Sequence, residues 1–213
     1  MTQCEIVQTF LEKIFKKSEP IFLSEIKIPG LTDVAIRQQL KKLIKKDVVK
    51  RYDTGIYFLP EKSMFNIEPT LAIYDVIYKK YLSDSNGICG YIGGFMFANK
   101  IGITTQVPSY YEVFTNKATT VCRTVRLGNI RTIIRRPYTV VNNQNASVLP
   151  LLDLLKNIDR ISEIEGTELE NCIYAYMTFK NISFQDLKPF FKYYPDSIYK
   201  NMYYIGLLND KSS

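Results

Sequence analysis

Hydrophobic residues recur at helical spacing through the first 46 positions of the chain. Those between residues 3 and 16 lie three and four apart, which predicts an amphipathic helix. Ser24 is placed to cap a short second helical turn before the Pro-Gly break at 29–30. From Thr32, in N-cap position, the pattern predicts a third helix that runs to about Lys46.

Two β-rich runs follow this third helix. They cover residues 48–52 and 56–59, and the Asp-Thr-Gly between them places Gly55 where a hairpin turn needs positive φ. Helix, short helix, helix and hairpin follow one another in a winged helix-turn-helix. The pattern therefore predicts such a domain over residues 1–60.

The third predicted helix has one apolar face and one polar face. Its core positions are Ile36, Leu40, Leu43 and Ile44. The opposite face is formed by Val34, Ala35, Gln38, Lys41, Lys42 and Lys45. Lysine side chains can bind DNA phosphates, and a glutamine side chain can hydrogen-bond to adenine. Basic residues near a hairpin turn can contact the sugar-phosphate backbone, as in the wing of a winged helix. The predicted DNA-binding residues are therefore Gln38, Lys41, Lys42, Lys45, Lys50 and Arg51. A winged helix used for protein contact is the alternative.

A polar stretch, EKSMFNIE, connects this module to the rest of the chain between Pro60 and Pro69. We expect the domain boundary there, with a DNA-binding domain over 1–60 and an α/β domain over 61–213.

The second module opens with a helical pattern over 70–82 and a short β-rich run over 88–92. Gly93 and Gly94 then turn the chain into a short helix that Gly102 ends, since glycine accepts the positive φ of such turns. We expect this turn and its aromatic neighbours to organise the core of the second module.

Three further β-rich runs cover residues 111–116, 121–127 and 130–136. A Gly-Asn pair joins the last two as a hairpin, and we expect the three to form an antiparallel unit. The third run carries a predicted basic edge formed by Arg131, Arg135 and Arg136. Guanidinium groups pair with phosphate or guanine, so these arginines are candidates for a second nucleic-acid contact. Protection of an exposed sheet edge is the alternative.

From residue 148 onward, four segments have helical spacing, and Thr167 and Glu170 lie at capping-box spacing in one of them. Tyrosines crowd this region at positions 174, 176, 193, 194, 199, 203 and 204. Little positive charge accompanies them in sequence, so we expect them to pack helices rather than stack on bases, and the surface suits a protein partner. The expected fold class is α+β: a winged helix-turn-helix, then a mixed α/β domain with an antiparallel sheet and C-terminal helices.

The charge of the chain is uneven. Its 213 residues carry a net charge of +7, and residues 1–60 hold 11 Lys/Arg against 7 Asp/Glu, residues 61–149 hold 10 against 5, and residues 150–213 hold 7 against 9. The positive first two thirds suit a polyanionic partner, with a solvated basic surface as the alternative.

The chain contains no histidine, which excludes Ser-His-Asp and Cys-His catalytic pairs and histidine-ligated zinc. The four cysteines form no Cys-x-x-Cys pair, so we expect buried free thiols in a reducing compartment. No segment approaches the roughly 18–20 apolar residues of a membrane span. We expect a cytoplasmic protein that contacts no membrane, is not an enzyme and uses no cofactor or metal.

One segment adds a family resemblance to this picture. Residues 90–108, GYIGGFMFANKIGITTQVP, followed by EVFTN and RLGNIRTIIRRP, resemble the C-terminal domain of the AbiEi-type antitoxins, and with the N-terminal module the resemblance covers most of the chain. These are the DNA-binding partners in bacterial type IV abortive-infection toxin–antitoxin pairs. The motifs are glycine and aromatic patterns without catalytic residues, so they support a fold and a pathway better than a mechanism.

The resemblance implies an antitoxin and transcriptional autorepressor that binds its own operator in double-stranded DNA. It further implies a nucleotidyltransferase-like toxin as the functional partner, opposed without the need for a stable complex. A stand-alone winged-helix transcriptional regulator without a toxin partner is the alternative.

Overall fold

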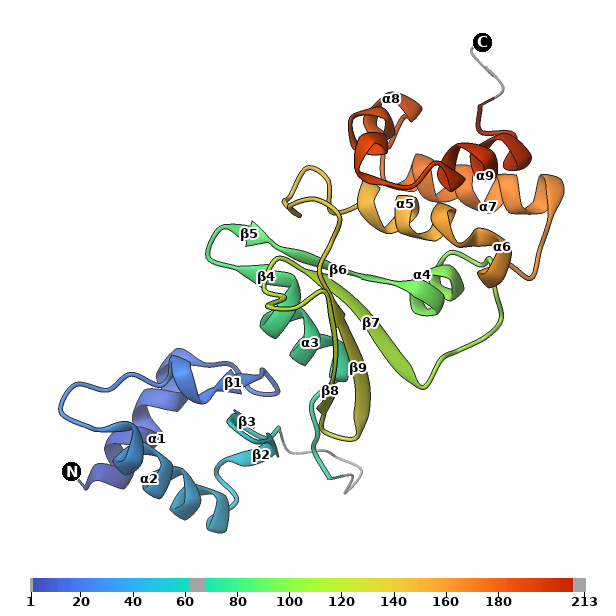
Figure 1. Ribbon diagram of the computed structural model, residues 1–213. Coiled ribbons are helices and arrows are strands. Elements are labelled where there is room, and N and C mark those ends of the chain that lie inside the picture. The colour runs from blue at the N-terminus through green and yellow to red at the C-terminus, as the bar shows by residue number, and fades with distance from the viewer. Residues whose placement is uncertain (1, 62–67, 209–213) are drawn as a thin grey trace. The chain divides into compact units, whose positions relative to one another are not determined.

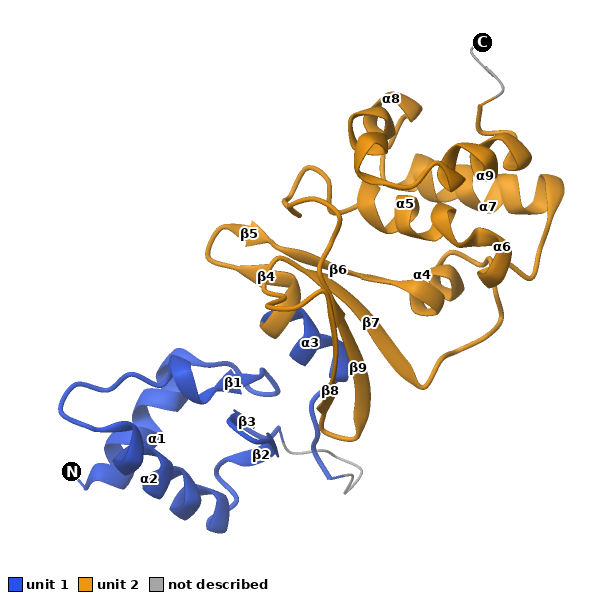
Figure 2. Ribbon diagram, in the orientation of Figure 1, with its two compact units in different colours: residues 1–79 blue, residues 80–213 orange. Residues whose placement is uncertain are grey.

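The computed structural model describes residues 2–61 and 68–208. Helices and small sheets alternate along the chain, so the fold is mixed α+β, as expected (Figure 1). The chain divides into two units, Met1–Lys79 and Lys80–Ser213 (Figure 2).

The first unit combines helices with a three-stranded sheet. Its elements are α1 (Gln3–Ile14), β1 (Ile21–Phe22), the 3-10 turn η1 (Leu23–Glu25), α2 (Asp33–Lys45), β2 (Lys50–Asp53), β3 (Ile56–Phe58) and α3 (Ile73–Ile77). β3 lies between β1 and β2 and is antiparallel to both. The predicted hairpin is confirmed, and Gly55 at its turn has φ of +74°.

The predicted second helical turn is present only as η1, and Ser24 does not cap it. Instead, the backbone N–H of Phe22 donates to Glu25 Oε2 over 2.8 Å. The turn stays short because the two residues of β1 before it pair with β3 and the Pro-Gly break at 29–30 follows closely.

The core of the first unit forms where α1 packs on α2. Val7 and Leu11 of α1, with Ile36 and Leu40 of α2, are each at most 1% exposed. α1 ends at Ile14, earlier than expected, and this side chain is 57% exposed rather than part of the apolar stripe.

The first unit extends past the boundary expected at Pro60. Lys79 Nζ forms ion pairs with Glu19 Oε1 at 3.0 Å and with Glu25 Oε2 at 3.2 Å. It also donates a hydrogen bond to the carbonyl of Pro20 at 2.6 Å. These contacts tie residues beyond 70 to the first unit. Most of the expected connection, residues 62–67, lies outside the described residues.

The second unit is larger and holds most of the sheet and helices. Its strands are β4 (Ser83–Asp84), β5 (Gly87–Ile88), β6 (Gly90–Gly93), β7 (Tyr110–Thr115), β8 (Cys122–Leu127) and β9 (Ile130–Arg135). Its helices are the π-helix η2 (Tyr78–Leu82, which begins in the first unit), α4 (Gly94–Lys100), α5 (Val148–Lys156), α6 (Ile158–Ile161), α7 (Gly166–Phe179), α8 (Phe184–Leu187), the 3-10 helix η3 (Lys188–Tyr193) and α9 (Ser197–Ile205). The helix predicted over 70–82 is therefore split between α3 and η2.

The main sheet is mixed rather than antiparallel, which corrects the expectation. Its strand order is β6-β7-β9-β8, and β7 pairs with β9 in parallel. The β8–β9 hairpin is antiparallel, as predicted, but β9 inserts between β8 and β7. Because β8 reverses the chain direction and β9 reverses it again, β9 runs the same way as β7.

The glycine turn after β6 is present as predicted. Gly94 has φ of +60° at the start of α4, and Gly102, with φ of +81°, follows the helix end. Phe97 is buried and meets the ring of Tyr176 edge to face, with centroids 5.1 Å apart. The turn therefore directs α4 into the core of the second unit.

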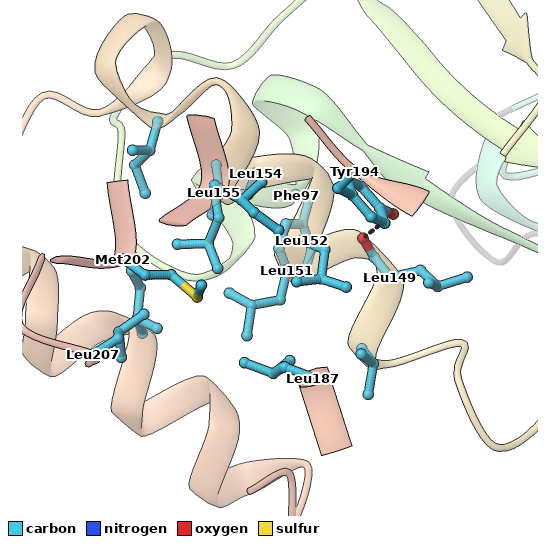
Figure 3. Close-up of a cluster of buried hydrophobic side chains, with 14 of the residues drawn as sticks. Phe97, Leu149, Leu151, Leu152, Leu154, Leu155, Leu187, Tyr194, Met202 and Leu207 are labelled. Atoms are coloured by element: carbon cyan, nitrogen blue, oxygen red, sulfur yellow. Dashed lines mark hydrogen bonds between the residues drawn. The ribbon is translucent and has the colours of Figure 1, made fainter. Parts of the chain in front are cut away.

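α5 is the centre of that core (Figure 3). Its leucines at 149, 151, 152, 154 and 155 are each at most 1% exposed, and the carbonyl of Leu149 accepts a hydrogen bond from Tyr194. A helix that is apolar on all sides needs cover on all sides, and α4, α6, α8, α9 and β6 supply it. Among the other C-terminal helices, α7 begins at Gly166 without the predicted Thr167 capping bond.

Asp153 is a buried polar residue on the largely apolar surface of α5. It is 4% exposed, and its carboxylate accepts hydrogen bonds from the Tyr91 hydroxyl and from Lys156 Nζ. Burial raises the pKa of Asp153, and these two donors oppose the rise. The buried carboxylate is thus partnered, and it links α5 to β6.

The cysteines follow the prediction only in part. All four thiols are free, but Cys122 is exposed on β8 and only Cys89 is buried. No helix in the described residues is long and apolar enough to cross a membrane.

The Glu163 carboxylate accepts hydrogen bonds from the segment that follows α4. Its protonation should therefore change the free energy of unfolding. Its carboxylate accepts from the Thr105 backbone N–H at 2.6 Å, the Thr105 hydroxyl at 2.8 Å and Gln106 Nε2 at 2.8 Å. These bonds, the backbone one foremost, lower the pKa of Glu163 from 4.5 to about 2.

Because the folded-state pKa is depressed, the stabilisation by Glu163 is fully present above about pH 4.5 and is lost as the pH falls toward about 2. We expect Glu163→Gln to lower the free energy of unfolding at pH 6 and to have a shrinking effect below pH 4.5. Urea unfolding followed by circular dichroism across this range measures it. A pH-independent difference between the two proteins would contradict the assignment.

Candidate nucleic-acid interface

α2 is held in one orientation by its cap and its buried face. Thr32 Oγ1 accepts from the backbone N–H of Ala35 at 3.2 Å, which confirms the predicted N-cap. The inward residues are Ile36, Gln39, Leu40 and Leu43, whereas Ile44, predicted for this face, is only half-buried.

Gln39 is a polar residue in this inward set. Its Nε2 donates to Gln3 Oε1 on α1 at 3.2 Å, and no partner for Gln39 Oε1 is present in the described part of the chain. The inward face thereby fixes which side of α2 meets solvent.

The solvent side matches the prediction and gains one residue. Val34, Gln38, Lys41, Lys42 and Lys45 are exposed, and Ala35 is half-buried. Arg37, which was not predicted, is exposed as well. It lies three residues after Val34 and four before Lys41, so helical spacing alone could have placed it there. We call Val34, Arg37, Gln38, Lys41, Lys42 and Lys45 the α2 outer face.

The charge of the α2 outer face is uncompensated within the described ranges 2–61 and 68–208. None of its four basic side chains there forms an ion pair, and Gln38 makes no hydrogen bond there. Exposed ammonium and guanidinium groups that form no such ion pair remain able to pair with a phosphate.

Lys50, one of the two basic residues predicted for the hairpin, is ion-paired within the first unit. Lys50 is half-buried, and its Nζ pairs with Asp47 at 3.2 Å and with Glu68 at 3.4 Å. The hydrogen bond with Asp47, foremost, raises the pKa of Lys50. This lysine is charged but already satisfied by two carboxylates.

Arg51 remains exposed on the hairpin. Its guanidinium donates to the carbonyl of Asp53 at 3.3 Å and to Thr54 Oγ1 at 3.2 Å, both at the turn. Both are uncharged acceptors, so Arg51 keeps a net positive charge for an outside phosphate.

The three arginines predicted for a basic edge are separated by the structure. β9 is an inner strand and β8 is the edge, because β9 pairs on both sides. Arg135 is half-buried and pairs with Glu112 on β7, with Nη2 to Oε1 at 2.9 Å, so it holds the sheet together. Arg136 Nη2 donates to the carbonyl of Thr119 at 3.4 Å.

Arg131 remains exposed, with its guanidinium 5.6 Å from the centroid of the Tyr110 ring. Directly opposite it on β8 lies Arg126, a second exposed arginine that the sequence argument had not selected. Like charges in direct cross-strand register repel, and an anion between them relieves the repulsion. Of the three predicted arginines, only Arg135 is in an ion pair among the described residues, so Arg131 and Arg136 stay candidates and Arg126 joins Arg131 as a cross-strand basic pair.

Each of these basic surfaces, taken by itself, carries charge that can pair with an anionic group. In the part of the chain that the structure describes, no three His, Cys, Asp or Glu side chains come together as metal ligands. Comparison of the sequence with protein-family models and with curated proteins finds no match.

Proposed function

We propose that the chain is a DNA-binding transcriptional regulator that recognises its own operator through the α2 outer face. The observation that carries the proposal is the row of four exposed basic residues and Gln38 on one side of a helix whose other side is buried. Lysine and arginine at helical spacing supply phosphate contacts, and glutamine supplies a base contact.

We infer further that the first unit works as a winged helix-turn-helix. The order α1, η1, α2 and the β2–β3 hairpin supports this inference, with η1 in place of a full second helix. α2 then serves as the recognition helix in the major groove, and Arg51 is the wing residue that contacts sugar-phosphate.

The second part of the proposal is that the regulator is also the antitoxin of a type IV toxin–antitoxin operon. The resemblance of residues 90–137 to the AbiEi-type antitoxins supports it. In this proposal the protein acts by binding rather than by catalysis, and the functional partner is a nucleotidyltransferase-like toxin. A stand-alone regulator without such a partner is the competing account.

A cell-based assay separates these accounts with full-length proteins. The wild type, Arg37→Ala/Lys41→Ala/Lys45→Ala (the α2 triple variant) and a matched control, Lys13→Ala/Lys16→Ala/Lys17→Ala, are each expressed beside a reporter driven by the chain's own promoter. In parallel, each is expressed with a nucleotidyltransferase-like gene if one lies beside the chain's own gene, and the lack of such a gene would favour the stand-alone regulator. The control also removes three positive charges, but from exposed positions in the last turn of α1 and just after that helix.

We expect the α2 triple variant to lose repression and to keep growth rescue, since the antitoxin part does not require operator binding. The control should keep both activities. Failure of the wild type to rescue growth would leave the stand-alone regulator as the better account, and unchanged repression by the α2 triple variant would refute the recognition surface.

A further inference from the structure

A groove of about 720 Å³ opens in the second unit between the segment 139–148 and a second wall formed by residues 180–182, just after the end of α7, together with α8 and η3. Its wall carries both amides and lysines, together with an aromatic ring. The residues that matter for its chemistry are Asn142, Gln144, Lys180, Gln185, Lys192 and Tyr193. We call these six residues the amide groove.

The segment that forms one wall is internally fixed. Asn142 Oδ1 accepts from the backbone N–H groups of Gln144 at 2.9 Å and Asn145 at 3.2 Å. Asn145 is buried, and its Nδ2 donates to the carbonyl of Val140 at 2.9 Å. A wall held in this way presents its outward side chains without a large ordering cost on binding.

Two amides of the groove are unused. Gln144 on this wall and Gln185 on α8 are exposed, and neither side chain has a hydrogen-bond partner among residues 2–61 and 68–208. An amide carries both donors and an acceptor, the combination that pairs with the edge of a nucleobase.

The charge at the groove favours an anion. Lys180 and Lys192 are exposed, and each Nζ lies over an aromatic ring, 5.1 Å from the Phe179 centroid and 5.0 Å from the Tyr193 centroid. In the described residues neither lysine pairs with a carboxylate. The one acid on the lining, Asp186, is bound by the backbone N–H and hydroxyl of Ser183 at 2.8 and 2.6 Å.

Exposed aromatic rings accompany these lysines, which corrects the expectation that the C-terminal tyrosines lack nearby positive charge. Tyr193 is 41% exposed on the groove, and Lys200 lies over the exposed ring of Tyr204 outside it. An exposed ring beside an ammonium group can stack on a base while the ammonium meets the phosphate.

From these features we infer that the amide groove binds a nucleotide. Lys180 and Lys192 pair with its phosphate, Gln144 and Gln185 bond to the edge of its base, and Tyr193 stacks on the base. The base must be unpaired to reach the amides, so the ligand is a free nucleotide or one in a single strand. This site is separate from the α2 outer face and does not rest on the operator proposal.

The test uses full-length protein in the α2 triple background, so that duplex-type binding by the first unit does not contribute. Two probes are compared, adenosine monophosphate by calorimetry and a fluorescent single-stranded RNA of about 12 nucleotides by anisotropy. Binding of the monophosphate identifies a mononucleotide site, and binding of the RNA alone identifies a strand site. Both outcomes support the inference if the groove variants weaken the binding and the control variant does not.

We expect Lys180→Ala/Lys192→Ala and, separately, Tyr193→Leu to weaken binding by about tenfold or more. Lys188→Ala/Lys200→Ala is the matched control, since these exposed lysines of η3 and α9 also lie over aromatic rings but are outside the groove. It should change affinity by less than about twofold, and thermal melts check that each variant folds. Equal losses for the two lysine pairs, or no binding of either probe, would overturn the inference.

Discussion

Replacing Gly90 with alanine should destabilise the second unit severely, by roughly 3 kcal/mol or more, because the new methyl group has no space. An ideal Cβ at this position would lie 2.6 Å from the carbonyl oxygens of both Phe114 and Tyr81 and 3.0 Å from Thr115 Cβ. The first two atoms are backbone, and the Tyr81 carbonyl also accepts the buried Thr115 hydroxyl at 2.6 Å. Relief of the clash would therefore break the β6–β7 pairing.

Gly166→Ala is the control for this prediction. Gly166 has a positive φ, of +56°, but no atom lies within 4 Å of the position that an alanine Cβ would take. That variant should therefore lose only the roughly 1–2 kcal/mol that a left-handed backbone costs a residue with a Cβ. Urea unfolding followed by circular dichroism compares the two. A loss for Gly90→Ala no larger than that for Gly166→Ala would contradict the close packing of β6 against its neighbours.

Much of this unit was predictable because its signals are local. Gly94 and Gly102, both with positive φ, mark a turn and a helix end through their own backbone conformation, and the apolar run of α5 predicts a buried helix. The parallel pairing of β7 with β9 was not predictable. It depends on which strand inserts beside β7, and a hairpin pattern is equally compatible with either order.

In the candidate site, too, features set by the local sequence were predictable and features set by tertiary contacts were not. Helical spacing predicted the α2 outer face, and applied to Arg37 it would have completed it. The ion pairs were less accessible to prediction. Asp47 lies three residues before Lys50, but Glu68 reaches the same ammonium from a distant part of the chain, as Glu112 reaches Arg135. Such partners depend on tertiary structure, and they decide which basic residues remain for a ligand.

The α2 triple variant should bind duplex DNA roughly a hundredfold more weakly than the wild type at about 0.1 M salt, for operator and unrelated sequences alike. Arg37, Lys41 and Lys45 follow one another at four-residue spacing along the exposed side of α2, and phosphate contacts carry no sequence information. Fluorescence anisotropy with the two duplexes measures the loss. Replacement of Lys13, Lys16 and Lys17 should lower the affinity much less. An equal loss of affinity in this control would mean that the net charge of the protein, and not the α2 outer face, determines binding.

Binding of duplex-DNA phosphates by the α2 outer face should show in the salt dependence of binding to the DNA upstream of the chain's own gene. Each phosphate contact contributes about 0.9 to the slope of log affinity against log salt. Loss of three phosphate contacts should make the slope for the α2 triple variant smaller by about 2.7 than that of the wild type, with the control variant unchanged. Identical slopes for all three proteins would contradict it.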